Sequence, residues 1–130
     1  MRVSTVSGSA GNTENVVFLF DSKQAKFRHN RYYDLPNVEL DRKHQFIKSW
    51  WYAGVVHCQD KQKYRITGDS LTFDTGVSYC PNEKRQGETG TLEFCKLTDG
   101  KKTTIRKTTG DADKLMSTFV KALWNASDEF

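Results

Sequence analysis

The stretch TLEFCKLTDGKKTTIR, residues 91–106, decides the fold class. From Thr91 to Leu97, apolar and polar side chains alternate, which is the period of a strand with one buried face. Asp99 and Gly100 then provide the residues of a hairpin turn, and residues 103–106 continue as the returning strand. We therefore predict an antiparallel hairpin over this stretch.

Three further segments also have the composition of strands. Residues 16–20 are β-branched and aromatic, which predicts a strand buried on both faces, and residues 23–33 are expected to return beside it as a hairpin. In residues 63–73, apolar side chains alternate with polar ones around a Gly-Asp turn, which predicts another hairpin with one buried face. Residues 49–58 are also expected to be a strand, after a short helix or irregular segment that begins at Asp41.

The C-terminal part of the chain has the pattern of an amphipathic helix. Residues 109–113 offer a capping side chain and two carboxylates for the positive end of the helix dipole. An apolar stripe at i, i+4 and i+8 follows, made of Leu115, Met116, Phe119, Val120, Leu123 and Trp124. We expect this stripe to close the open face of the sheet. The predicted fold class is therefore α+β, an antiparallel sheet of hairpins packed against one C-terminal amphipathic helix.

Length and composition indicate one domain. The chain has 130 residues, of which 36% are hydrophobic and 12% aromatic, and this is too apolar for intrinsic disorder. Residues 1–14 are rich in Ser, Thr and Gly and are expected to form a flexible N-terminal segment, followed by a single domain over residues 15–130. Residues 81–90 are polar and are expected to form a mobile loop.

The sequence favours no membrane span and no disulfide framework. Its longest apolar stretches are far shorter than the ~20 residues that cross a bilayer, and residues 1–9 lack the apolar core of a signal peptide, so a cytoplasmic location is expected. The three cysteines form no CxxC pair. A bridge between Cys80 and Cys95, across a loop between strands, is the pairing that we consider. The three histidines lack the spacing of metal ligands, and we expect neither a metal site nor a cofactor.

Basic residues supply the most usable functional signal. The chain carries 20 Lys and Arg against 16 Asp and Glu, a net charge of +4. One cluster lies between residues 23 and 33, where no acidic residue intervenes, and it consists of Lys23, Lys26, Arg28 and Arg31 with the aromatic residues Tyr32 and Tyr33. A second cluster consists of Lys101, Lys102, Arg106 and Lys107. If both clusters lie on one face of the sheet, they form a phosphate-binding surface.

These clusters predict a non-enzymatic binding domain with a basic face. Cationic side chains release counterions from phosphates, and aromatic rings stack on bases, so RNA or single-stranded DNA is one candidate partner. A phospholipid headgroup and an acidic protein are the others. A solvated charged face without any partner is the alternative in each case.

A short N-terminal motif resembles the phosphate-binding loop of flavodoxins. The residues are Ser7-Gly8-Ser9-Ala10-Gly11-Asn12-Thr13, and the resemblance implies a redox protein that binds FMN through backbone N–H groups at a helix N-terminus. The residues after it, however, read as a strand where a flavodoxin has a helix.

Three other resemblances imply different functions. Residues 47–73 are similar to small lipocalin-like barrels, which implies an apolar ligand held near Trp50, Trp51 and Phe73. A strand-rich body that ends in one helix looks like a pleckstrin-homology-like domain, which implies phosphoinositide or peptide binding. Residues 68–71 spell the nucleophile block of GDSL-type esterases, which implies Ser70 as nucleophile. All histidines precede Ser70, so no downstream base is available and catalysis is not expected.

Overall fold

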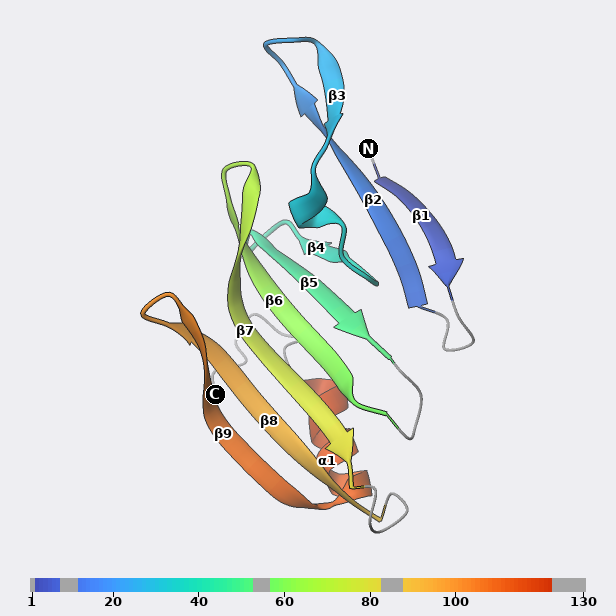
Figure 1. Cartoon of the computed structure of the whole chain (residues 1–130), viewed down its shortest axis with the longest axis vertical. Coiled ribbons are helices and arrows are strands. Elements are labelled where there is room, and N and C mark those ends of the chain that lie inside the picture. The colour runs from blue at the N-terminus through green and yellow to red at the C-terminus, as the bar shows by residue number, and fades with distance from the viewer. Residues whose placement is uncertain (1, 8–11, 53–56, 83–87, 123–130) are drawn as a thin grey trace.

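A six-stranded antiparallel sheet forms the body of the molecule (Figure 1). The computed structural model describes residues 2–7, 12–52, 57–82 and 88–122. Each strand of this sheet pairs with its neighbours in the sequence, and the strands are β4 (Glu39–Asp41), β5 (Phe46–Trp51), β6 (Gln59–Thr67), β7 (Ser70–Pro81), β8 (Thr89–Thr98) and β9 (Lys101–Asp111). Helix α1 (Ala112–Lys121) follows directly. The predicted α+β class with one C-terminal helix is confirmed.

Both predicted hairpins in the second half of the chain are present. Strands β8 and β9 pair from Thr98 and Lys101 outward, and the turn between them places Asp99 at φ 50° and Gly100 at φ 73°. Positive φ at both central residues is the conformation of a two-residue turn that matches the twist of the strands. In the β6–β7 turn, Gly68 has φ 60°. Local turn chemistry therefore fixes the register of both hairpins.

A second, three-stranded antiparallel sheet precedes the body. Its strands are β1 (Arg2–Ser7), β2 (Asn12–Asp21) and β3 (Lys26–His29). The first half of β2 pairs with β1 and the second half pairs with β3, so a hairpin is present as expected. Its returning strand is shorter than the predicted residues 23–33, because β3 ends at His29 and residues 31–33 form a short helix. The flexible segment expected over residues 1–14 differs from this arrangement, because residues 2–7 are a strand and β2 already begins at Asn12. The β-branched residues Val3, Thr5 and Val6 in this segment favour a strand.

Asn12 also bears on the flavodoxin resemblance. It begins a strand, whereas the flavodoxin pattern requires a helix after the phosphate-binding loop. The fold implied by that resemblance is therefore wrong; residues 8–11 of the motif lie outside the described residues.

The segment around Asp41 is a hairpin, not the expected short helix or irregular segment. Strands β4 and β5 pair antiparallel, and Gln45 in the turn has φ 60°. Strand β5 begins at Phe46, earlier than the predicted start at Ser49. The partial helical spacing of the apolar residues was misleading here, because Ile47 and Trp50 belong to a strand that is covered on both faces.

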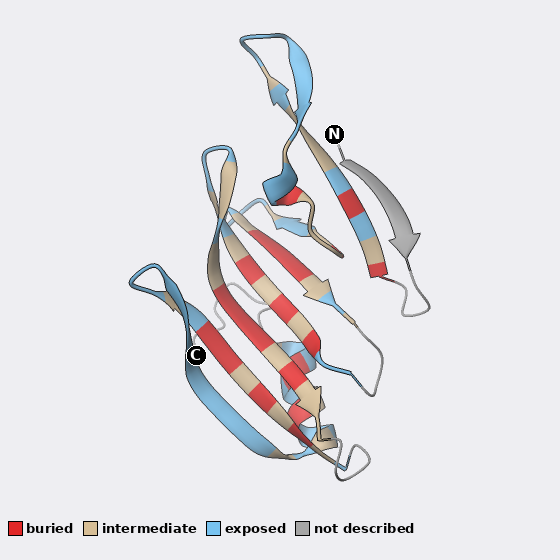
Figure 2. Ribbon diagram, viewed as in Figure 1, coloured by how far each residue is buried: buried red, intermediate tan, exposed pale blue. Residues whose placement is uncertain are grey.

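Helix α1 covers one face of the sheet and completes the core. Its buried residues Leu115 and Phe119 pack against Val77, Tyr79, Leu92 and Phe94 on β7 and β8. Figure 2 shows this buried band across the middle strands, whereas β9 and the β2–β3 hairpin are exposed. Asp111 caps the helix by accepting a hydrogen bond from the Lys114 N–H, as the acidic start of this segment predicted. Of the predicted stripe, Val120 is exposed, and residues 123 and 124 lie outside the described residues.

A buried lysine fastens the other end of the helix. The side chain of Lys61, on β6, is only 2% exposed. Its Nζ donates hydrogen bonds to the carbonyl oxygens of Phe119 at 2.9 Å and Val120 at 2.6 Å. The last carbonyls of a helix lack intrahelical partners and carry the negative end of the dipole, so a cation is favoured there. The Lys61 ammonium also lies 4.9 Å from the centre of the Phe119 ring.

A small amide network joins the two sheets. Asn37, in the left-handed region at φ 44°, donates to the Trp50 carbonyl at 2.8 Å and to Asn12 Oδ1 at 2.7 Å. Asn12 Nδ2 in turn donates to the Tyr52 carbonyl at 2.6 Å, and Asn37 Oδ1 accepts the Thr13 N–H at 2.7 Å. Asn12 and Asn37 are both buried. Buried amides whose donors and acceptors are satisfied specify one arrangement of the chain.

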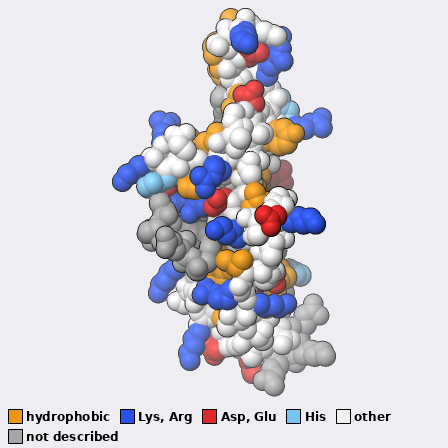
Figure 3. Space-filling model, turned by 90° about the vertical axis from the view of Figure 1, so that its left-hand side faces the viewer, with side chains coloured by type: hydrophobic (Ala, Val, Ile, Leu, Met, Phe, Trp, Pro, Cys, Tyr) orange, Lys and Arg blue, Asp and Glu red, His pale blue; other side chains and the backbone are white. Residues whose placement is uncertain are grey.

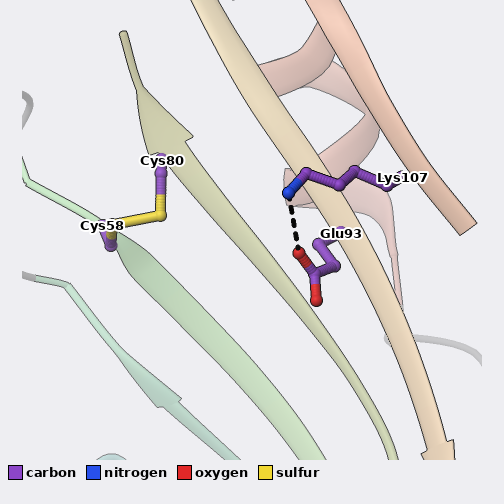
Figure 4. Close-up of a disulfide and its surroundings, with 4 residues drawn as sticks. All are labelled: Cys58, Cys80, Glu93 and Lys107. Carbon is purple, nitrogen blue, oxygen red and sulfur yellow. Dashed lines mark ion pairs between the residues drawn. A yellow bond between two sulfur atoms is a disulfide. The ribbon is translucent and has the colours of Figure 1, made fainter. Parts of the chain in front are cut away.

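The disulfide joins Cys58 and Cys80 (Figure 4). The pairing considered from the sequence, Cys80 with Cys95, is wrong. Gln59 pairs with Tyr79 in the β6–β7 ladder, so Cys58 and Cys80 stand opposite each other at its end. Cys95 is opposite Gly76 instead, and it is a buried free thiol. The hairpin register, which spacing alone does not give, decides the pairing.

We predict one reactive thiol in the unreduced, denatured protein. Alkylation in denaturant followed by peptide mapping should label Cys95 alone, and all three cysteines after reduction. Reduction should also lower the free energy of unfolding by about 3 kcal/mol, because the bridge closes a loop of moderate length. A disulfide-linked peptide that contains Cys95 would contradict the pairing.

Replacing Lys61 should destabilise the fold. The Lys61→Met variant keeps the aliphatic stem but removes the hydrogen bonds of the ammonium to the two carbonyls at the end of α1, and we expect a loss of about 2 kcal/mol in the free energy of unfolding. Urea denaturation followed by far-UV circular dichroism measures this. The matched control is Lys96→Met, at an exposed position of β8, which should change stability by less than about 0.5 kcal/mol. Equal stability of the two variants would refute the role of Lys61.

Candidate functional site

The β2–β3 hairpin projects beyond the other strands at one end of the molecule (Figure 1). We call residues 18–29 the hairpin arm. Because side chains alternate between the faces of a strand, the arm has an aromatic face and a charged face. The cross-strand pairs that define these faces are Phe18 with His29, Leu19 with Arg28, Phe20 with Phe27, and Asp21 with Lys26.

The aromatic face carries two cross-strand ring pairs. Phe20 and Phe27 meet edge to face with their ring centres 5.3 Å apart, and Phe18 and His29 are 5.5 Å apart. Phe20 is 59% exposed and Phe27 is 52% exposed. Such a pair stabilises a hairpin by roughly 0.2–1 kcal/mol, yet most of its apolar surface still faces water. Adjacent exposed aromatic residues on a projecting element are typical of binding surfaces.

The charged face of the arm is mainly basic, and its one acidic residue, Asp21, contacts both the turn and Arg28. Asp21 accepts hydrogen bonds from the Lys23 and Gln24 N–H groups at 3.0 and 3.2 Å, which closes the tip of the arm. The same carboxylate lies 3.2 Å from Arg28 Nε. Lys23 and Lys26 are exposed beside it. Residues 23–33 contain no acidic residue in the sequence, but in the structure Asp21 lies beside them and partly neutralises their positive charge.

A groove of about 490 Å³ lies between the arm and the β6–β7 turn. Its lining residues combine both charges: Leu19, Phe20, Asp21, Ser22, Lys23, Arg28, His29, Asn30 and Asp69. The Asn30 side chain donates to the Asp69 carbonyl at 2.5 Å, and His29 Nε2 lies 2.5 Å from Asp34 Oδ2. These contacts hold the base of the arm against the sheet.

Short helix η1 (Arg31–Tyr33) carries the other residues of the first predicted cluster. Arg31 is exposed, and Tyr32 is 65% exposed. Tyr33 is 7% exposed, and burial, followed by the nearby Asp69 charge, raises the pKa of its hydroxyl. Of the two tyrosines predicted to stack on a partner, Tyr32 is therefore the one whose ring lies at the surface, and Tyr33 is buried.

The second predicted cluster lies elsewhere, on β9. Lys101, Lys102 and Arg106 are exposed, but the last two point to opposite faces of the sheet. Lys102 Nζ lies 5.0 Å from the Phe73 ring centre, whereas the Arg106 guanidinium lies 4.1 Å from the Phe94 ring centre on the helix side. Lys107 pairs with Glu93 at 3.7 Å (Figure 4).

The two clusters do not merge into one basic patch. Seen from the side that carries β9, Lys and Arg side chains are spread along the whole molecule (Figure 3). Sequence reasoning also missed the aromatic face of the arm, because the run at residues 16–20 was expected to be buried on both faces. The signal was available in the spacing of Phe18 and Phe20, which places both rings on one face.

The residues expected to hold an apolar ligand in a lipocalin-like barrel are not gathered around one cavity. Trp50 and Trp51 line a recess of about 160 Å³, but Phe73 is not part of it. Phe73 instead packs edge to face on Tyr64, with ring centres 6.0 Å apart.

Comparison with known proteins shows the fold alone. No family model and no curated protein matches the sequence. Among solved structures, the chain is similar to one described as a Xanthomonas type IV secretion system related protein, with a TM-score of 0.58 and 16% identity. The match covers 81% of this chain and 52% of the other, so the chain corresponds to about half of that protein's length.

We predict that the exposed rings of the arm contribute little to stability. The double variant Phe20→Ser, Phe27→Ser should lower the free energy of unfolding by no more than about 1 kcal/mol, because it removes a surface pair. By contrast, Phe119→Ala in the core should cost about 3–5 kcal/mol. Thermal or urea unfolding of both variants measures the difference. A loss of similar size in both would show that the aromatic face is structural.

Proposed function

We propose that the protein is a non-enzymatic binding domain whose hairpin arm contacts an acidic surface of a partner protein. The observation that carries this proposal is the combination of Phe20 and Phe27, both more than half exposed, with Lys23, Lys26 and Arg28 on one projecting hairpin. Aromatic residues and Arg are enriched at the centres of protein interfaces. Cations around them accelerate encounter with an acidic partner.

Two features favour a protein over a nucleic acid as the partner. Asp21 and Asp69 line the same groove as Lys23 and Arg28, and carboxylates in this position oppose the approach of a phosphate backbone. In addition, the Cys58–Cys80 disulfide is typical of proteins in oxidising compartments. This argues against the cytoplasmic location expected from the N-terminus and against access to cellular nucleic acids. Single-stranded nucleic acid and anionic lipid remain alternative outcomes of the test.

Within the described residues, no helix is long and apolar enough to span a membrane.

Reversing the charge of the arm should weaken binding to an acidic probe. The probe is a fluorescent peptide that is rich in Asp and Glu and contains Leu and Trp, measured by anisotropy at salt concentrations between about 50 and 200 mM. We expect Lys26→Glu, Arg28→Glu to weaken binding at least about tenfold, or about 1.4 kcal/mol. The Phe20→Ser, Phe27→Ser variant should weaken it by a similar factor that depends less on salt.

The matched control is Lys101→Glu, Lys102→Glu, which makes the same change of net charge on β9. This variant should keep most of the affinity. Equal loss in both charge variants would show that only net charge matters, and loss in the control alone would move the site to β9. Tighter, more salt-sensitive binding of the native protein to single-stranded RNA or to vesicles with anionic lipid would overturn the choice of a protein partner.

A further inference from the structure

The face of the six-stranded sheet opposite to α1 carries its own set of polar side chains. Lys61 and Lys63, on β6, point to the helix side, and both are buried there. Because side chains alternate along a strand, the residues between and beside them, Asp60, Gln62 and Tyr64, point to the opposite face. That face is therefore acidic at the position where the helix side is basic.

A recess of about 160 Å³ opens on this face beside β5 and β6. It is lined by Leu35, Pro36, Ser49, Trp50, Trp51, Asp60, Gln62 and Tyr64. Its volume equals that of roughly five water molecules at about 30 Å³ each, which suits a short alkyl chain with a polar head. The recess shares no lining residue with the groove beside the hairpin arm.

The walls of the recess are held in place by the sheet and by the connection that precedes β4. Trp51 is the cross-strand partner of Asp60, and it is 38% exposed. The Ser49 hydroxyl donates to the Pro36 carbonyl at 2.6 Å, which fastens the connection over β5. The Tyr64 hydroxyl donates to Gln62 Oε1, so these two side chains fix each other. The site is therefore formed before any ligand arrives.

Asp60 is the charged residue of this recess, and it also borders a smaller hollow of about 60 Å³ that Glu93 and Lys102 line. Among the described residues, it makes no hydrogen bond through its side chain and no ion pair within 4.0 Å. Burial raises the pKa of its carboxyl group, and the charge of the more distant Lys102 partly offsets this. The other titratable groups near Asp60 are Tyr64 and Cys95, which respond to its charge, and Glu93, which lines the same small hollow. A half-buried carboxylate without an ion pair within 4.0 Å is destabilised, and a cation bound directly to it relieves this.

We propose that the recess binds an alkyl-ammonium or alkyl-guanidinium group, such as the side chain of a Lys or Arg residue, with Asp60 as the anionic acceptor. The cationic head forms charge-assisted hydrogen bonds to the carboxylate. The alkyl stem packs against the apolar wall formed by Leu35, Pro36 and Trp51, as long cationic side chains do on aromatic surfaces. This site is independent of the arm, because it has the opposite charge and different residues.

The test uses small probes on the native, disulfide-bonded chain. The cationic probes are Nα-acetyl-lysine amide and Nα-acetyl-arginine amide, with putrescine as a free amine and Nα-acetyl-norleucine amide as a neutral control. Binding is followed by NMR through the indole N–H of Trp51, and we expect dissociation constants in the millimolar range for a single side chain. Norleucine amide should bind at least about tenfold more weakly. Binding of the lysine and arginine probes without putrescine assigns the site to a partner side chain, and tighter binding of putrescine assigns it to a free amine.

The Asp60→Asn substitution should lower the affinity for the cationic probes at least about tenfold and leave the affinity for the neutral probe unchanged. The matched control Asp113→Asn removes a carboxylate from the exposed first turn of α1 and should have no effect. Equal binding of lysine and norleucine amides, or unchanged affinity in Asp60→Asn, would overturn the proposal.

A pH series on the native protein provides a second readout that needs no variant. The carboxyl group of Asp60 has a raised pKa and must be ionised to hold a cation. Affinity should therefore be full above that pKa and fall as the pH is lowered through it, while the neutral probe shows no such change. Affinity for the lysine probe that stays constant down to the ordinary pKa of an Asp would contradict the role of Asp60.

Discussion

The ammonium group of Lys61 joins the six-stranded sheet to helix α1, and the arrangement of the rest of the body depends on this contact. A lysine is rarely buried to this degree unless its charge is satisfied. Here the two carbonyl oxygens at the end of α1 accept its hydrogen bonds, and the ring of Phe119 lies beside it. The buried ammonium lacks water, and the carbonyl oxygens at the end of the helix carry the negative end of its dipole; the Phe119 carbonyl also accepts the Ala122 N–H at 3.3 Å. Their mutual satisfaction fixes where the helix ends over β6, while Leu115 and Phe119 fix how it packs.

Once the helix occupies that face, the alternation of β6 determines what the opposite face presents. Lys61 on the helix side requires Asp60 and Gln62 on the open side. The amide network around Asn37 then sets the connection that borders the open face, because it links β2 to β5 through buried hydrogen bonds. The hairpin arm extends from the same strand β2, so its position relative to the body also depends on this network. Lys61 and Asn37 therefore influence both the packing of the core and the side chains presented on the open face.

The sequence predicted the parts of the fold that local chemistry determines. The β8–β9 hairpin and the cap of α1 follow from alternation, an Asp-Gly turn and a carboxylate at the helix start, which all act within a few residues. The segment before Ser49 was mispredicted as a helix or irregular segment, since its apolar spacing fits two periods and only pairing with β6 decides between them. The disulfide was mispaired for the same reason, because a bridge depends on the register of β6 and β7. Buried lysines were not anticipated, since hydropathy patterns assign Lys to water.

The sequence also predicted only those parts of the candidate surfaces that depend on neighbouring residues. The exposed cations at Lys23, Lys26 and Arg28 could be read from the sequence, because a short polar hairpin cannot bury them. That Asp21 partly neutralises them is a result of the turn geometry. The recess around Asp60 combines residues of three segments, and no linear motif brings them together. Because α1 covers the helix side of the core strands, the described surface that is left for recognition consists of the arm, the open face and β9. The arm and the open face differ in charge, so a partner that uses both must present acidic and basic groups to different parts of this fold.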